Sequence, residues 1–234
     1  MTGFRPLAPG VYPANDCPDY RSSARRAPRA PAVAIPHTCS ETCGPRAGAT
    51  RLRPGAQDLA RQVAGGVALG QRILVHGRVS DDHGRAVAAA LVEVWQANAA
   101  GRYHHDHDRH DAPLDACFIG AGQCLTDGDG HYAFHTIEPG AYPWGNHHNA
   151  WRPRHIHFSL FGNAWGSRLV TQMYFPGDPL LELDPIFMGV ADARARARLV
   201  AAYDHAHSEP GQALAYRFDI VLRGPTQTPW ENRP

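Results

Sequence analysis

The sequence lacks the long apolar segments that direct a chain into a membrane. Nowhere in its 234 residues is there an uninterrupted apolar run of about 18, the length that a spanning helix needs. The N-terminal segment also contains no apolar core of the kind found in a secretory signal. We therefore expect a cytoplasmic protein without membrane contacts.

An excess of charge of either sign is also missing. Lysine and arginine number 23 against 22 acidic residues, which gives a formal net charge of +1. A nucleic-acid surface needs concentrated positive charge, and the alternating Arg194, Arg196 and Arg198 would spread around a helix instead of forming one stripe. The balance predicts no nucleic-acid partner and favours a small-molecule substrate.

Cysteine is scarce and odd in number. The five cysteines are irregularly spaced and form no C-x-x-C pair of the kind that binds zinc. This usage argues against a disulfide framework, so we expect five free thiols. They are Cys17, Cys39, Cys43, Cys117 and Cys124.

The composition of the chain changes at about residue 70. Residues 1–70 are rich in proline, arginine and alanine, which predicts an extended arm with one short helix within residues 58–66. Residues 71–234 carry strand-like runs separated by turn residues, and we expect them to form one catalytic domain. The predicted strands cover residues 72–80, 88–97, 131–137, 154–162, 168–175 and 216–224.

Few helices are predicted between these strands. The succession of strands favours an all-β fold, an antiparallel β-sandwich with the N-terminal arm and one or two peripheral helices. The clearest helix is predicted at Asp192–Ala206, where alanine and arginine have high helix propensity.

Histidine is concentrated in one part of the chain. Ten of the 15 histidines lie between Tyr103 and His157. In the run RHIHFSLFG, strand alternation places His155 and His157 on one face, with Ile156 and Phe158 on the other. Neutral imidazole is the commonest transition-metal ligand, so the pair indicates a metal site. A buried or cross-strand-paired histidine would produce the same pattern.

Further ligands are available near this pair. The segment YHHDHDRHD, residues 103–111, could supply a third histidine or a carboxylate for zinc, but its composition also suits a solvated loop. Tyr103 and Tyr142 each follow a glycine-bearing turn, and each taken alone is compatible with a packing role.

Three segments together resemble the intradiol ring-cleavage dioxygenases. They are LVEVWQANAAGRYHHDHDRHDAPLD, CLTDGDGHYAFHTIEPGAYPW and WRPRHIHFSL. The likeness extends to CPDYRSSARRAP and IPHTCSETCGP in the arm, and to QMYFPGDPL and LAYRFDIVLRG near the end. The ordered set spans most of the chain, and it is most similar to the iron-bearing β chains of the family. The resemblance implies a β-sandwich enzyme that opens the ring of protocatechuate, or of a close catechol, with O2.

The resemblance also implies a metal centre with one Fe(III) per chain. Its ligands on the matching motifs are Tyr103, Tyr142, His155 and His157. Tyrosinate is a hard anionic donor that suits a ferric ion, and the charge of the ion lowers the pKa of a phenol below its free value of about 10. Tyr142 matches the tyrosinate that a bound catechol displaces, which gives it a catalytic role as a base.

Other site residues follow from the same resemblance. Arg152 matches an arginine that lies over the substrate and stabilises negative charge on the ring. The substrate pocket is implied to include Tyr20, Trp144 and Ile186, and the surroundings of the metal ligands to include Gln172, Trp95 and His110. Two positions depart from the family pattern: Gly145 replaces an arginine and His110 replaces a tyrosine. The loss of that arginine removes a contact for a substrate carboxylate.

The resemblance implies a homologous α chain as partner, in a hetero-oligomer. Three alternatives stay open at this point. The enzyme could cleave another catechol, such as catechol or hydroxyquinol; the chain could be a non-catalytic sandwich used for binding; or His155 and His157 could serve a zinc hydrolase.

Overall fold

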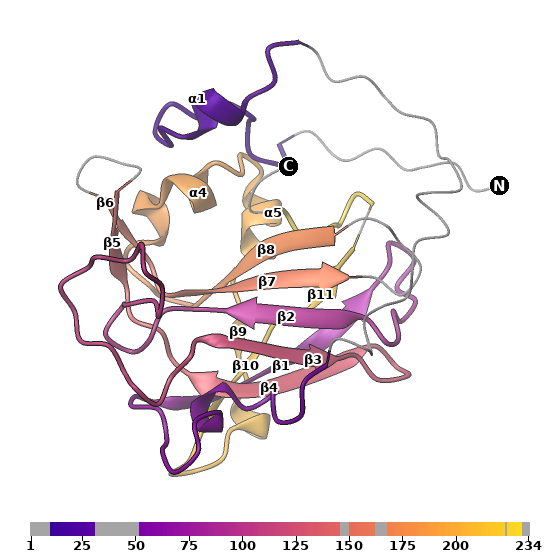
Figure 1. The fold of residues 1–234 in the computed structure, drawn as a ribbon. Helices are drawn as coiled ribbons and strands as arrows, with labels where there is room; N and C mark the ends of the chain where they lie inside the picture. Colours follow the sequence, from indigo (N-terminus) through magenta and orange to yellow (C-terminus); the bar gives the residue numbers. More distant parts are fainter. Residues whose placement is uncertain (1–9, 31–51, 146–149, 162–167, 223, 231–234) are drawn as a thin grey trace.

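The core of the protein is built from two β-sheets, seen in Figure 1. The computed structural model describes residues 10–30, 52–145, 150–161, 168–222 and 224–230. Within these ranges most of the regular structure is strand and the helices are few and short, so the predicted all-β class is confirmed. No described helix has the length and apolar character that crossing a membrane requires.

The first sheet is organised around β1 (Arg72–Ser80). On one side β1 pairs with β4 (His131–Ile137) in the antiparallel sense. On the other side it pairs in parallel with β10 (Leu214–Arg217) and β11 (Ile220–Val221), and β9 (Ala202–Tyr203) lies antiparallel beyond β10. The sheet is therefore mixed, whereas the sequence suggested antiparallel pairing throughout.

The second sheet carries the predicted histidine pair. Its order is β3 (Ala121–Leu125), β2 (Leu91–Trp95), β7 (His155–Phe161) and β8 (Arg168–Tyr174), with every neighbour antiparallel. A separate two-stranded hairpin of β5 (Tyr142–Trp144) and β6 (Ala150–Arg152) stands beside it.

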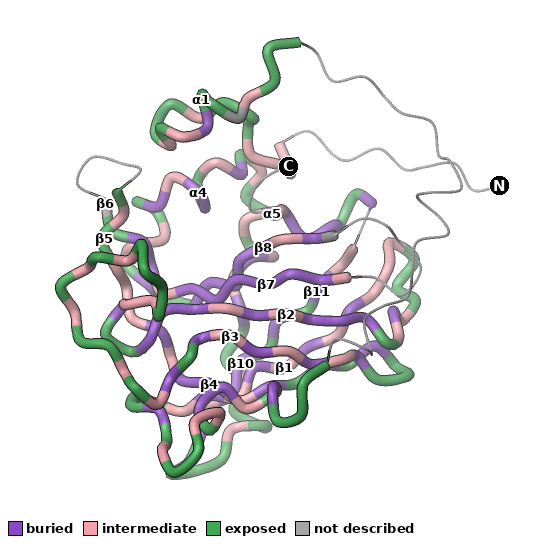
Figure 2. The backbone as a smooth tube through the Cα atoms, viewed as in Figure 1, coloured by how far each residue is buried: buried purple, intermediate pink, exposed green. Residues whose placement is uncertain are grey.

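The two sheets bury one hydrophobic core between them. Ile73 and Val75 of β1 share this core with Ile156 and Phe158 of β7, and the rings of Phe134 and Phe158 lie 5.8 Å apart. Along β1 buried and half-buried residues alternate, while β7 is buried on both faces, as Figure 2 shows. A strand buried on both faces can place polar side chains inside the protein on the face away from the core.

All described helices are short. The α-helices are α1 (Ser23–Arg26), α4 (Pro185–Met188) and α5 (Ala193–Ala197), and the 3-10 helices are η1 (Leu59–Arg61), η2 (Leu181–Leu183) and η3 (His205–His207). α1, α4 and α5 lie together beyond β8 in Figure 1. The short helix expected within residues 58–66 is reduced to η1.

The predicted helix at Asp192–Ala206 is wrong beyond its first turns. α5 ends at Ala197, and the backbone of Tyr174 in β8 then bonds to Leu199 and Ala201. These bonds draw the following residues into β9, against β10. Tertiary pairing here overrides the helix propensity of an alanine- and arginine-rich segment.

Part of the predicted arm contributes to the folded body. Leu59 and Ala60 are fully buried in the core between the sheets, and Val11 packs with Phe187 near α4. The boundary at residue 70 stays a prediction. Cys17, Cys117 and Cys124 are free thiols, while Cys39 and Cys43 lie outside the described residues.

Candidate active site

Four aromatic side chains from three segments converge at one end of β7. The Nε2 atoms of His155 and His157 lie 3.2 Å apart, and Tyr142 Oη lies 3.3 Å from His155 Nε2. The Tyr103 ring completes the group, 5.4 Å from the Tyr142 ring and 6.4 Å from that of His157. The structure thus brings together the four side chains that the resemblance named as metal ligands, and we call Tyr103, Tyr142, His155 and His157 the ring cluster.

A glycine turn brings the two tyrosines together. Gly101 has a φ of 80°, and a Cβ atom there would lie 2.1 Å from the carbonyl oxygen of Ala141. Only glycine allows the loop after β2 to approach the start of β5 so closely. Two residues further on, the backbone N–H of Tyr103 donates to Asp108 Oδ2 over 2.7 Å, which fixes the chain that carries the phenol.

His155 is held neutral, with Nε2 directed at the cluster. His155 is only 2% exposed, and its Nδ1 donates a hydrogen bond of 2.6 Å to the carbonyl oxygen of Pro153. Burial, followed by the positive charge of Arg152, lowers the pKa of His155 well below its usual value. A proton on Nδ1 leaves the lone pair on Nε2, which is the arrangement that metal-binding histidines use.

His157 is held by its neighbours in the sheet. The Trp95 ring stacks on it, with centroids 4.8 Å apart and planes 4° from parallel. Trp95 and Gln172 are its register partners on the strands to either side. The structure therefore places both residues beside one of the four side chains that the resemblance implies as metal ligands.

Arg152 lies in a buried network of polar groups. Its Nε lies 3.0 Å from Asp184 Oδ1, and Nη2 donates to Asp184 Oδ2, to Tyr174 Oη and to Gln172 Oε1. Burial alone would lower the pKa of Arg152, but Tyr174 and Asp184 raise it above its ordinary value. Arg152 is therefore a permanent cation at the edge of the ring cluster.

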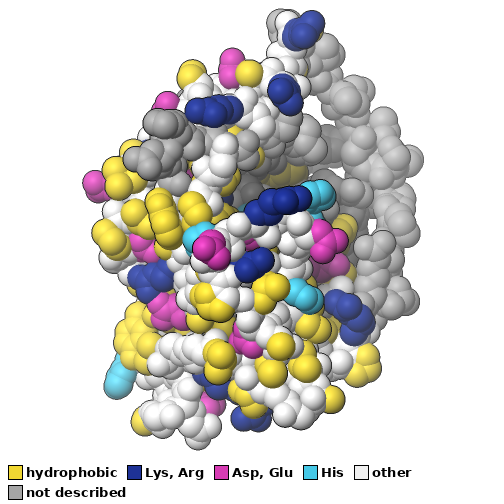
Figure 3. Space-filling view, turned by 60° about the vertical axis from the view of Figure 1, so that its left-hand side comes forward, with side chains coloured by type: hydrophobic (Ala, Val, Ile, Leu, Met, Phe, Trp, Pro, Cys, Tyr) yellow, Lys and Arg dark blue, Asp and Glu magenta, His cyan; other side chains and the backbone are white. Residues whose placement is uncertain are grey.

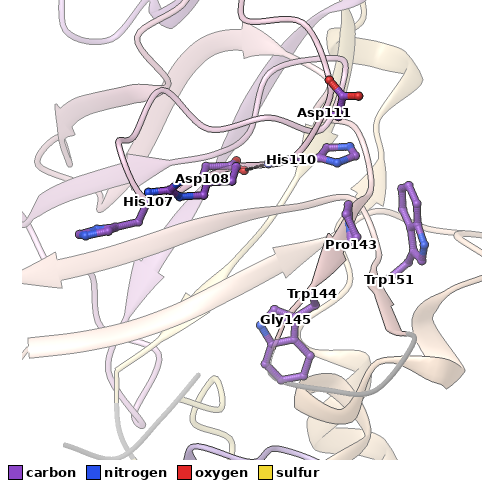
Figure 4. Close-up of a pocket in the computed structure, with 9 residues that line it drawn as sticks. His107, Asp108, His110, Asp111, Pro143, Trp144, Gly145 and Trp151 are labelled. Atoms are coloured by element: carbon purple, nitrogen blue, oxygen red, sulfur yellow. Dashed lines mark hydrogen bonds between the residues drawn. The ribbon is translucent and has the colours of Figure 1, made fainter.

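A surface hollow lies beside the β5–β6 hairpin. Tyr142 is paired with Arg152 and Pro143 with Trp151, so alternation turns the first pair to one face and the second pair to the other. A hollow of about 580 Å³ is lined by Pro143 and Trp151 of the second face, by Trp144 and by His110, among other residues (Figure 4). His110 lies edge-on to Trp151, with centroids 5.9 Å apart, and it lines this hollow. Asp108 accepts from the backbone N–H groups of both Tyr103 and His110.

Tyr20 and Arg152 lie beside Trp144. The Tyr20 ring lies 4.8 Å from the Trp144 ring, and the guanidinium carbon of Arg152 lies 5.5 Å from the centre of that ring. Ile186 of α4 is buried and lines a narrow crevice with Tyr20. The arm thus reaches the side of the hairpin that adjoins Arg152.

Sequence reasoning missed the acidic partner of Arg152. Asp184 is fully buried, and its other role is to cap α4 by accepting from the backbone N–H of Ile186. The only signal in the sequence is an aspartate directly before Pro185, which is typical of an ordinary helix start. Nothing in that pattern indicates a partner 32 residues away in the chain.

The surface on this side of the protein carries both signs of charge. In Figure 3 basic, acidic and histidine side chains are interspersed with hydrophobic ones over the visible face. A mixed face of this kind agrees with the balanced composition of the chain and gives no continuous field of one sign.

Known families match most of the chain. A family profile described as Dioxygenase matches residues 44–224, and one described as Protocatechuate 3,4-dioxygenase beta subunit N terminal matches residues 5–38. The protocatechuate 3,4-dioxygenase beta chain of Burkholderia cepacia is 58% identical over 221 residues, 94% of either chain. The corresponding alpha chain of Pseudomonas putida is 29% identical over 206 residues, 85% of this chain and 97% of its own.

Solved structures show the same architecture. Hydroxyquinol 1,2-dioxygenase from Pseudomonas putida DLL-E4 superposes with a TM-score of 0.52 at 30% identity, covering 71% of this chain and 59% of its own. 3-Chlorocatechol 1,2-dioxygenase from Rhodococcus opacus 1CP gives a TM-score of 0.54 at 22% identity, over 73% and 65%, and shares the fold. The profiles and the relatives cover both the arm and the sandwich.

Proposed function

The chain belongs to the intradiol ring-cleavage dioxygenases, and on that premise we propose that it is the iron-bearing β subunit of a protocatechuate 3,4-dioxygenase. The reaction joins protocatechuate and O2 and opens the ring between the two hydroxylated carbons, giving 3-carboxy-cis,cis-muconate. The observation that carries the proposal is 58% identity to such a β chain over 94% of the sequence.

The donor set of the ring cluster fits a ferric ion. It combines two phenols with two imidazoles, and the bond from His155 Nδ1 to Pro153 leaves Nε2 available within 3.3 Å of both Tyr142 Oη and His157 Nε2. Two tyrosines are foreign to the usual zinc set of histidine, cysteine and carboxylate, which supports iron over a zinc hydrolase. Bound Fe(III) would withdraw electron density from a catecholate and expose its ring to attack by O2.

Two side chains have roles of their own in this reaction. As a phenolate, Tyr142 would take up a proton at Oη from a catechol hydroxyl, since Oη borders the cluster and the phenol ring is only half-buried. Arg152 is a fixed buried cation on the same face of the hairpin as Tyr142. Its charge would stabilise the negative charge that develops on the ring as it reacts.

The proposed partner is a homologous α chain, in the cytoplasm. Support comes from the sequence itself, which is similar both to β chains and, more distantly, to α chains of protocatechuate 3,4-dioxygenases. Two homologous chains have related surfaces, which favours a hetero-oligomer built on pseudo-symmetric contacts.

The first experiment is a visible spectrum of the purified protein, with iron and zinc quantified on the same sample. We expect a tyrosinate-to-iron(III) band that shifts when protocatechuate is added without oxygen, followed by uptake of one O2 per substrate once air is admitted. A colourless protein that holds zinc, or that stays metal-free after reconstitution with iron, would overturn the proposal in favour of a hydrolase or a binding module.

A second candidate substrate is a catechol without a carboxylate. The observation that favours it is Gly145, which stands where related β chains have an arginine and leaves open space beyond its Cα. Since no atom of the described residues outside its chain neighbours lies within 4 Å of a Cβ placed there, Gly145→Arg should fold normally. We expect the variant to lower KM for protocatechuate roughly tenfold relative to catechol, the scale of one hydrogen bond to a charged group. Gly145→Gln, which adds bulk without charge, is the matched control. If wild-type protein prefers catechol and Gly145→Arg leaves that ratio unchanged, protocatechuate is not its substrate.

A further inference from the structure

A second group of metal-ligating side chains lies in the first sheet. It comprises His76 of β1, Asp204 at the N-cap of the 3-10 helix η3, and His207, the last residue of η3, and we call it the His76 triad. One ligand atom of each residue lies within 4.8 Å of the others. Asp204 Oδ2 is 3.1 Å from His76 Nε2 and 2.8 Å from His207 Nδ1, and the two imidazole centroids are 4.6 Å apart.

The triad is separate from the ring cluster. Ile73 and Val75 of β1 face the core between the sheets, so alternation turns His76 to the opposite face. The histidines of the ring cluster belong to β7, in the other sheet. An ion in the triad would therefore share no ligand with one in the ring cluster.

The triad is arranged to offer lone pairs at one point. Asp204 Oδ1 accepts from the backbone N–H groups of Ala206 and His207, which leaves Oδ2 facing the two imidazoles. His76 Nε2 is a buried atom, and within the described residues it has no hydrogen-bond partner of good geometry despite the nearby carboxylate. Burial, followed by repulsion from His207, lowers the pKa of His76, so its imidazole is neutral.

A positively charged side chain close to the triad is engaged in an ion pair of its own. Arg217 is the register partner of His76 on β10, but its guanidinium is 2.7 Å from Asp219 and bonded to it. The side chain of His207 is 61% exposed, whereas those of Asp204 and His76 are 19% and 18% exposed. The site is open on the His207 side, where water could complete a coordination shell.

We propose that His76, Asp204 and His207 bind one divalent transition-metal ion of the zinc class, in addition to the catalytic iron. Two imidazoles and one carboxylate are donors of intermediate softness, which suit Zn²⁺. Ca²⁺ and Mg²⁺ prefer sites made of oxygen ligands alone, so this set disfavours them. The ion takes the place of the proton between His207 Nδ1 and Asp204 Oδ2. It ties β1 to the turn that joins β9 to β10, and so stabilises the edge of the first sheet.

The test is equilibrium dialysis of iron-loaded protein against Zn²⁺, with both metals quantified per chain. Wild-type protein should bind about one zinc without losing iron. His207→Ala should raise the Kd for zinc at least ~10-fold. Loss of a residue that only hydrogen-bonds to a metal ligand already lowers metal affinity about 10 to 100-fold, and His207 is itself a proposed ligand. His207 is largely exposed, so this variant should fold.

Two controls decide which histidines are responsible. His205→Ala removes the neighbouring histidine of the same turn and should leave zinc binding unchanged. The double variant His105→Ala, His107→Ala tests the exposed histidine loop, whose two rings lie 5.1 Å apart. The proposal is overturned if wild-type protein takes up no zinc beyond the iron site, if His207→Ala binds zinc as tightly as wild type, or if only the loop variant loses it.

Discussion

The pair His155 and His157 lies on a β-strand, whereas the pair His205 and His207 lies on a 3-10 turn. Both pairs have one residue between the histidines. On the strand, alternate side chains share a face, so the two Nε2 atoms meet at 3.2 Å. A 3-10 turn has about 3 residues per turn, so side chains two apart diverge by roughly 120°. Only His207 faces His76, while His205 lies near Tyr203. The same spacing therefore places both histidines of the strand at one site, whereas only one histidine of the 3-10 turn reaches the His76 triad.

The two sites also differ in burial and in the charges that support them. His155 and His157 are 2% and 8% exposed and are backed by the buried pair of Arg152 and Asp184. The His76 triad is open to water through His207 and relies on the one carboxylate of Asp204. We therefore expect changes at the ring cluster to have large effects and changes at the triad to have small ones.

The largest expected contrast is between His157→Ala and His207→Ala. His157→Ala should lose bound iron and lower turnover of protocatechuate at least ~100-fold. Loss of a residue that only hydrogen-bonds to a metal ligand already lowers metal affinity or activity about 10 to 100-fold. His207→Ala should keep both iron and turnover. The measurement is iron content and kcat on the same preparations, with circular dichroism to establish folding. Equal iron loss in both variants would contradict the expectation that iron depends on His157 and not on His207.

The strand pair is the part of the site that local sequence predicts well. Alternation along residues 155–158 depends only on the period of a strand, and β1 and β4 likewise have the predicted bounds, 72–80 and 131–137. Local periodicity is independent of which segments meet later. The four rings as a set, in contrast, were identified through resemblance, because Tyr103 and Tyr142 carry no distinguishing pattern.

Contacts between distant segments were not predictable in this way. The pairing of Arg152 with Asp184 and that of His76 with His207 both depend on how the sheets and turns assemble. The helix expected to continue after Ala197 fails for the same reason, because β8 and β10 offer backbone partners that propensity does not take into account.

The next largest effect concerns the ionic support of the ring cluster. Asp184→Ala leaves the buried Arg152 cation without its carboxylate, which should lower the free energy of unfolding by about 3–5 kcal/mol. Asp204→Asn should change it much less, because water solvates that site and asparagine can still accept the turn's backbone N–H groups. Urea unfolding of both variants, in iron-loaded protein, is the measurement. Similar midpoints for the two variants would show that burial does not distinguish the sites.

A smaller effect is expected from the ring that orients His157. Trp95→Leu removes the stacked indole and should lower kcat roughly tenfold, since an aromatic pair contributes about 0.5–1.5 kcal/mol beyond its burial. Iron content should stay at the wild-type level because all four proposed ligands remain. Tyr203→Leu, which removes the ring beside His205, is the control and should leave kcat unchanged. A Trp95→Leu protein that loses its iron would mean that the indole supports binding rather than orientation.

The smallest expected effect is a change in Tm, and it compares how readily metal leaves the exposed site and the buried site. With free zinc about tenfold above Kd, binding at the His76 triad should raise the free energy of unfolding by about 1.4 kcal/mol. For a chain of this length that raises Tm by roughly 3–6 °C. Brief treatment with a chelator should abolish that gain and leave the visible band intact, because one ligand of the triad is 61% exposed while the histidines of the ring cluster are buried. Scanning calorimetry and absorbance on the same sample follow the two sites separately. If the band fades as fast as Tm falls, metal release is governed by something other than burial, and the contrast between the two histidine pairs extends only to geometry.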